Sequence, residues 1–120
     1  MGHYVDGFVI PVPRDRIDEY RRVAEQAAVV WKECGALDFW ECVGDDLDAP
    51  GMVSFLQLAG ASPEETVMFS WVVFESREHR DRANEKIMAD PRLKEMMNPD
   101  RPIFDFKRMA YGGFKQLVHG

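Results

Sequence analysis

Three acidic residues lie inside segments that are otherwise apolar, and they are the first residues in this chain that could do chemistry. Asp6, Asp38 and Glu41 each interrupt a run of aromatic and β-branched residues. A carboxylate buried in such a segment must find a partner or take up a proton. Beside a base or a hydroxyl group it could act as a general acid or base. The same pairing is also the ordinary way to satisfy a buried charge, so a structural role is the more frequent explanation.

Asp6 is the strongest of these candidates because it lies between two aromatic residues on the same face of a predicted strand. Its available partners are the hydroxyl group of Ser70 and the basic side chains of Lys107 or Arg108. A carboxylate joined to a hydroxyl group and a base would make a usable site. The residues are consistent with both a ligand site and a structural ion pair.

Aromatic side chains on the predicted strands could line a ligand cavity, although such rows more often form the core. The candidate ligand-binding set that combines the aromatic and polar residues is Asp6, Trp40, Ser70, Lys107, Arg108 and Tyr111. Within this set, the pattern does not single out a catalytic residue.

The histidines give no metal-binding pattern. His3, His79 and His119 are dispersed, and none occurs in an HxH, HxxxH or HExxH spacing. His79 lies in the first turn of a predicted helix, where a surface or capping role is expected. The two cysteines, Cys34 and Cys42, are too few for a complete zinc site. We therefore predict no metal site and no cofactor.

The segment from Thr66 to Ser76 must position the candidate residues, because it is the longest apolar run and is rich in β-branched and aromatic residues. We predict that it forms the central strand. Alternate side chains of a strand point to opposite faces, and here both faces are apolar, so both must be covered. The predicted helices suffice for one face. We expect a second copy of the protein to cover the other.

The predicted elements follow the order strand, helix, strand, strand, helix, strand. The strands are expected at 4–12, 36–44, 66–76 and 104–118, and the helices at 14–33 and 77–89. This order is typical of an α+β fold of the ferredoxin-like, split βαβ type. Such a fold has an antiparallel sheet in the order 4-1-3-2 with both helices on one face. The bare face is then available for a homodimer.

Three segments are less regular. Residues 47–65 are predicted to be a loop with a weak extra strand or helical turn. Asp90 and Pro91 should start a second short helix, with Leu93, Met96 and Met97 facing inward and residues 98–102 breaking it. Gly112-Gly113 within the last strand indicates a bulge or a close approach of the backbone.

Length and composition limit the classes of protein that need to be considered. With 120 residues the chain is predicted to be a single domain, residues 1–120. Its net charge of −6 makes nucleic acid a poor partner. Neither a membrane span nor a signal peptide is evident. We expect a cytoplasmic protein.

Several motifs resemble those of a known family. They are Tyr4-Val-Asp-Gly-Phe8, Glu41-Cys-Val-Gly-Asp-Asp46, the run Phe69 to Asp81 continuing to Asp90-Pro-Arg92, and Phe106 to Phe114. Together they resemble the DUF1428 family, the YbaA-like small bacterial proteins, over essentially the whole chain. The resemblance implies a dimeric α+β barrel, in which two ferredoxin-like sheets close around a cavity. It implies no reaction, because fold alone does not define a site.

Two hypotheses about function follow. The first is a homodimer that binds a small, partly apolar ligand, with cofactor-free oxygenase-like or isomerase-like chemistry carried by Asp6, Ser70, Arg108 and Tyr111. The second is a non-enzymatic interaction or stress-related dimer module, in which the polar strand residues only satisfy one another.

Overall fold

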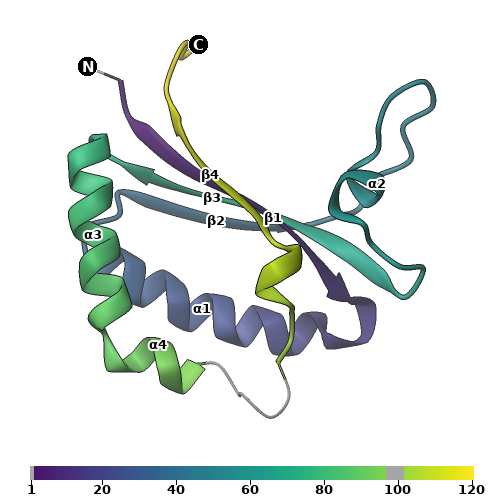
Figure 1. The fold of residues 1–120 in the computed structure, drawn as a ribbon, viewed down its shortest axis with the longest axis horizontal. Coiled ribbons are helices and arrows are strands. Elements are labelled where there is room, and N and C mark those ends of the chain that lie inside the picture. The colour runs from purple at the N-terminus through teal and green to yellow at the C-terminus, as the bar shows by residue number, and fades with distance from the viewer. Residues whose placement is uncertain (1, 97–101) are drawn as a thin grey trace.

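A four-stranded antiparallel sheet organises the chain. In the computed structural model, which describes residues 2–96 and 102–120, the strands are β1 (Tyr4–Pro13), β2 (Asp38–Val43), β3 (Glu65–Phe74) and β4 (Ala110–Lys115). Their order across the sheet is β2-β3-β1-β4 (Figure 1). The predicted α+β, ferredoxin-like fold and its strand order 4-1-3-2 are therefore confirmed. The predicted central strand is indeed β3, between β2 and β1.

The main helical layer lies on one face of the sheet and contains two long helices and a short one. These are α1 (Ile17–Glu33), which continues a 3-10 turn at Arg14–Arg16, α3 (Arg77–Ala89) and the short α4 (Pro91–Met96) (Figure 1). The Ser76 hydroxyl group accepts a hydrogen bond from the backbone N–H of His79 at 3.1 Å, as its position before α3 predicts. The His79 ring accepts another from the backbone N–H of Glu75 at 3.1 Å, which confirms a capping role. In the part of the chain that the structure describes, no helix is long and apolar enough to cross a membrane.

A short helix outside the main layers occupies the region predicted to be a loop with a helical turn. It is α2 (Phe55–Ala59), which begins with a capping box between Ser54 and Gln57 and ends at Gly60 in the left-handed conformation. Its Phe55 ring packs against Phe69 of β3, with centroids 5.7 Å apart. The helix thus touches the face of the sheet that α1 does not cover.

The last strand is shorter than predicted. Residues 106–108, expected to be part of a strand, form a 3-10 helix, because the Asp105 side chain accepts a hydrogen bond from the backbone N–H of Lys107 at 2.9 Å and turns the chain. No bulge occurs at Gly112-Gly113, since β4 pairs with β1 in unbroken register from Ala110 to Lys115. The alternative prediction, a close backbone approach, is confirmed. A Cβ atom at Gly113 would lie 2.8 Å from Arg80 Nη1.

The two faces of β3 have different surroundings. Met68, Ser70, Val72 and Phe74 are buried beneath the helices. On the other face, Phe69 is 44% exposed and Trp71 is half-buried. Both faces carry large apolar side chains, as predicted, but α1 and α3 cover only one, and the short α2 covers only part of the other. The predicted inward position of Met97 and the break at 98–101 lie outside the described residues.

Candidate functional site

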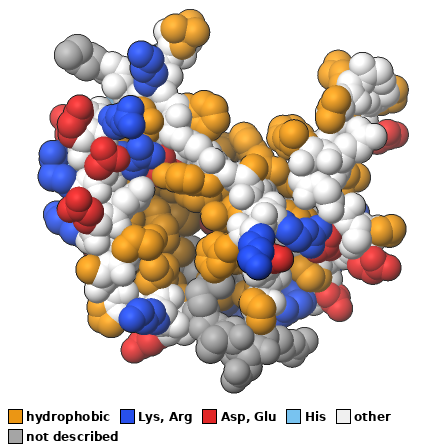
Figure 2. Space-filling model, in the orientation of Figure 1, with side chains coloured by type: hydrophobic (Ala, Val, Ile, Leu, Met, Phe, Trp, Pro, Cys, Tyr) orange, Lys and Arg blue, Asp and Glu red, His pale blue; other side chains and the backbone are white. Residues whose placement is uncertain are grey.

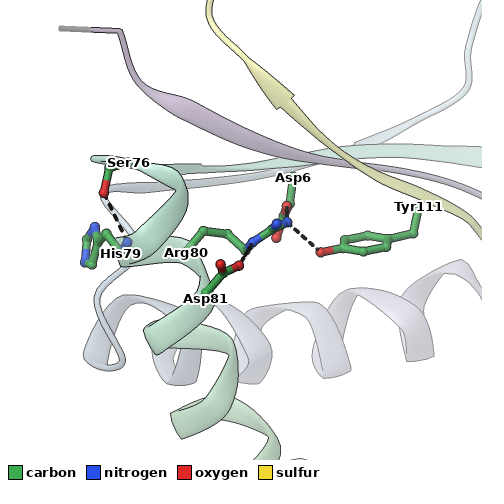
Figure 3. Close-up of polar contacts among 6 residues, drawn as sticks. All are labelled: Asp6, Ser76, His79, Arg80, Asp81 and Tyr111. Atoms are coloured by element: carbon green, nitrogen blue, oxygen red, sulfur yellow. Dashed lines mark hydrogen bonds and ion pairs between the residues drawn. The ribbon is translucent and has the colours of Figure 1, made fainter.

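The carboxylate of Asp6 is buried, but its partner comes from a helix. Asp6 is only 1% exposed, and Arg80 Nη1 of α3 donates a hydrogen bond to its Oδ1 at 2.6 Å (Figure 3). The predicted partners Ser70, Lys107 and Arg108 are wrong. The strand register explains the first error, because Ser70 lies opposite Phe8 rather than opposite Asp6.

Arg80 is itself held by several groups. Its Nε donates to Asp81 at 2.7 Å, and its Nη1 also donates to the Tyr111 hydroxyl oxygen at 3.1 Å (Figure 3). Its guanidinium carbon lies 4.8 Å from the centre of the Tyr4 ring. Burial raises the pKa of the Tyr111 hydroxyl group, and the negative charge of Asp6 raises it further. This cluster joins α3 to β1 and β4 and satisfies the buried charge within the protein.

Lys107 and Arg108 lie elsewhere. Arg108 donates to both carboxylate oxygens of Glu65, at 2.7 and 2.9 Å, and to the carbonyl oxygen of Gly60 at 2.8 Å. The hydrogen bonds from Arg108 lower the pKa of Glu65 to about 2. Lys107 is exposed in the 3-10 turn. Arg108 thus connects the segment before β4 to the start of β3, away from Asp6.

Trp40 lies on the other face of the sheet. Its ring stacks on Trp71 with centroids 5.6 Å apart, and its Nε1 donates to Asp38 at 2.9 Å. The helix-facing Ser70 is on the opposite side of the strands. The structure therefore does not gather the six predicted residues in one place. Asp6 and Tyr111 share a cluster, whereas Trp40, Ser70 and the two basic residues are separate from it.

An apolar cavity of about 300 Å³ lies between the sheet and the helices. Figure 2 shows hydrophobic side chains gathered in a hollow beside α3 and β4. The aromatic residues that line the cavity are Phe8, Tyr20, Trp31, Phe39, Phe104 and Phe106. Met88, Met96 and Met109 add adaptable side chains. Among the described lining residues, the polar groups are only Tyr20, Glu41 and Ser70.

Glu41 is the carboxyl group of this cavity. It projects from β2 on the helix side, directly opposite Ser70 of β3. The Tyr20 hydroxyl group donates to Glu41 Oε1 at 2.9 Å, and Ser70 is a second hydrogen-bond partner. Burial raises the pKa of Glu41, and the two hydrogen bonds offset this only in part. Burial also raises the pKa of Tyr20, and the nearby Glu41 charge adds to the effect.

Glu41 also lies on the boundary with a second hollow. This hollow, about 290 Å³, is bounded by α1 and the β2 edge and shares Tyr20, Ala24, Phe39 and Glu41 with the main cavity. Its lining includes the exposed residues Arg21 and Glu25. Glu41 is thus positioned to meet a ligand on the apolar side while remaining near groups that face solvent.

Part of this arrangement could be expected from the residue pattern. Glu41 was an acid–base candidate but not a member of the predicted ligand-binding set. The missed signal is that Glu41 and Ser70 are both polar at helix-facing positions of neighbouring strands. Tyr20 has no such signal, because its position on α1 fits an ordinary apolar stripe.

The fold and the cavity define a class of protein, an α+β ferredoxin-like domain with a pocket between sheet and helices. The chain belongs to the DUF1428 family, whose model, described as a protein of unknown function, matches residues 3–106. It is 46% identical over 115 residues to the uncharacterized protein YbaA of Escherichia coli strain K12, covering 96% of this chain and 97% of that protein. The YbaA protein of Shigella flexneri matches with the same identity and coverage.

Solved structures support the fold alone. A NIPSNAP family protein of unknown function from Agrobacterium tumefaciens aligns with a TM-score of 0.59 at 14% identity, over 95% of this chain and 87% of that one. A NIPSNAP domain protein from Burkholderia xenovorans gives 0.57 at 11% identity, over 98% and 94%. A protein described as dimeric and ferredoxin-like, from an uncultured marine organism, gives 0.55 at 9% identity, over 100% and 92%.

A metal centre finds no support in the part of the chain that is described. Across residues 2–96 and 102–120, no three His, Cys, Asp or Glu side chains are grouped so that they could hold a metal ion.

Proposed function

We propose that this protein is a homodimer that binds a small, largely apolar molecule in the cavity between the sheet and the helices. The observation that carries the proposal is the cavity itself, about 300 Å³ and apolar except for a carboxyl group and two hydroxyl groups. Ligand sites are typically apolar with a few polar groups that set orientation, and this volume is near the small end of their range. A small ligand is therefore favoured.

Glu41 is the group that would exchange a proton with such a ligand. Burial moves its pKa upward, toward the range in which a carboxyl group works as a general acid or base near neutral pH. Proton transfer of this kind is the step that isomerase-like or cofactor-free oxygenase-like chemistry would need. This role replaces the one that the sequence assigned to Asp6.

Filling the cavity tests the binding proposal. Ala27 lines the cavity from α1, so Ala27→Phe would occupy part of it. Val29 is on the same helix but 52% exposed, so Val29→Phe is the matched control. A thermal-shift panel of small aromatic acids, aldehydes, quinones and amines should reveal a stabilising ligand for the parent protein. Stabilisation of about 2.7 kcal/mol is expected at a hundredfold excess over Kd. It should be lost in Ala27→Phe and kept in Val29→Phe.

The dimer is supported by the open face of the sheet. Phe69, Trp40 and Phe114 are between 44% and 62% exposed there, alongside the half-buried Trp71. Contiguous apolar surface of this kind is typical of a protein interface. The dimeric description of one structural neighbour agrees with this.

Light scattering at micromolar concentration tests the dimer. We expect a dimer for the parent protein, a monomer for Phe69→Glu and a dimer for Val29→Glu, which places the same charge on the helix layer. A monomeric parent protein would refute the dimer. If the dimer is found but no compound in the panel binds, the alternative of a non-enzymatic interaction module is favoured.

A further inference from the structure

The cavity contains an acidic group without a basic counterpart. Glu41 is hydrogen-bonded by Tyr20 and Ser70, which are both uncharged hydroxyl groups. No Lys or Arg is among the described residues that line the cavity. We propose that the cavity binds a small organic cation, an apolar amine, with Glu41 as its counter-charge. This inference rests on the proposed ligand-binding function and names the class of ligand.

Two other carboxylates of the sheet show what is missing at Glu41. Asp6 is paired with Arg80 at 2.6 Å, and Glu65 is paired with Arg108 at 2.7 Å. A charge in an apolar environment is costly unless an opposite charge compensates it. Glu41 is half-buried, and a proton or a cation from outside the lining would relieve the cost of its charge. A bound ammonium group supplies that charge and restores the carboxylate form.

None of the described charged or titratable groups around Glu41 supplies a positive charge to its carboxylate, so a ligand can supply that charge. Helix α1 contributes Tyr20 and, in the second hollow, Arg21 and Glu25. Arg21 is exposed and already paired with Asp18 at 3.0 Å. From α3, α4 and residues 104–109, the described side chains that line the cavity are apolar.

The aromatic lining favours the same class of ligand. Six aromatic residues border the cavity, and they come from the sheet, from α1 and from the segment before β4. Trp31 and Phe39 meet edge to face with centroids 6.1 Å apart, and Tyr20 and Phe104 are 5.9 Å apart. Aromatic faces attract cations, most strongly away from water. A carboxylate ligand would instead be repelled by Glu41 and would find no cationic side chain among the described residues of the lining.

Three probes of similar shape test the charge preference. They are 2-phenylethylamine, 2-phenylethanol and 3-phenylpropionate, titrated into the full protein by calorimetry. The amine should bind at least about tenfold more tightly than the alcohol, as one charged hydrogen bond predicts. The propionate should show no binding. In Glu41→Gln the preference for the amine over the alcohol should disappear, whereas Glu78→Gln, an exposed change of equal charge on α3, should retain it.

The pH profile separates a counter-charge from a purely structural role. The amine stays protonated between about pH 4.5 and 7.5. Its affinity should rise across this range as Glu41 ionises, while the affinity of the alcohol stays flat. Glu41→Gln should give a flat profile for both probes.

The possible failures are distinguishable. Equal binding of the amine and the alcohol, or an amine preference that survives Glu41→Gln, overturns the inference and leaves the cavity as a ligand site. Failure of all three probes also overturns it. The proposed function itself falls only if no compound of the wider panel binds in the cavity.

Discussion

Two carboxylates point from the sheet toward the helices, and the difference between their partners separates the structural from the functional part of this protein. Asp6 meets a guanidinium group that is itself held by Asp81 and Tyr111. Among the residues that the structure describes, Glu41 meets only hydroxyl groups, on the boundary of an apolar cavity. A fully paired carboxylate is satisfied by the fold. One that is bonded only to hydroxyl groups retains the capacity to change its charge when a ligand or a proton arrives.

The largest effect should come from breaking the Asp6 pair. Among the described residues, Asp6→Asn leaves the largely buried Arg80 with only the exposed Asp81 as a carboxylate partner, and we expect the free energy of unfolding to fall by roughly 3–5 kcal/mol, as for other broken buried pairs. Chemical denaturation measures this. Adding Arg80→Met should recover part of the loss, because it removes a guanidinium group that has lost its buried carboxylate and keeps the exposed Asp81. A change below about 1 kcal/mol would place Asp6 among the functional rather than the structural residues.

A smaller effect is expected from crowding the same cluster. In Gly113→Ala the new methyl group would meet the side chains of Tyr4 and Arg80, with Arg80 Nη1 at 2.8 Å. Overpacking of this kind should lower the free energy of unfolding by about 1–3 kcal/mol. Gly112→Ala is the control, since its methyl group would meet only the Phe114 ring, at 3.6 Å. Equal effects of the two changes in denaturation experiments would mean that the cluster is not tightly packed.

The corresponding change beside Glu41 should matter less. Tyr20→Phe removes one hydroxyl donor, but Ser70 remains and the carboxyl group can take up a proton. We expect a loss of about 1 kcal/mol in the free energy of unfolding at neutral pH. Tyr111→Phe, at a more exposed hydroxyl group beside Arg80, should cost less. A loss for Tyr20→Phe as large as that for Asp6→Asn would contradict the distinction between the two carboxylates.

The fold could be predicted because its signals are local and repeated. The Thr66–Ser76 segment, which is apolar on both faces, supplies most of β3, and the helical stripe after Arg14 forms α1. The end of the chain could not be predicted as well, because one hydrogen bond, donated by the backbone N–H of Lys107 to the Asp105 side chain, replaces strand with a 3-10 turn. Such a contact leaves no periodic pattern in the sequence.

The site was harder to predict than the fold because pairing depends on geometry. The sequence correctly marked Asp6 as a buried carboxylate in need of a partner. It could not single out Arg80, which is one of several charged residues on α3 and differs from Arg77 and Arg82 only in its direction. The register of β1 against β3 also shifts Ser70 from Asp6 to Phe8, a difference of two residues that changes the proposed site.

The smallest predicted effect is a dependence of stability on pH that distinguishes Glu41 from Glu65. Below the ordinary pKa of 4.5, Glu41 is protonated in both folded and unfolded chains, so its contribution to stability is fully present. Burial raises the pKa of Glu41 in the folded chain, so as pH rises Glu41 ionises first in the unfolded chain. Its contribution to stability is lost progressively, and the loss is complete once pH exceeds the folded pKa. The glutamine side chain introduced by Glu41→Gln cannot ionise, so the variant avoids this loss. Its free energy of unfolding should therefore increase relative to that of the parent protein as pH rises from about 4. Glu65 should behave in the opposite way. Its pKa is lowered to about 2, so its contribution is present above 4.5 and lost as pH falls. Glu65→Gln should therefore approach the parent protein as pH is lowered, and denaturant titrations at a series of pH values measure both differences. A Glu41→Gln difference that does not change with pH would mean that this carboxyl group titrates alike in the folded and unfolded chains, and the cavity would then hold no group prepared to change its charge.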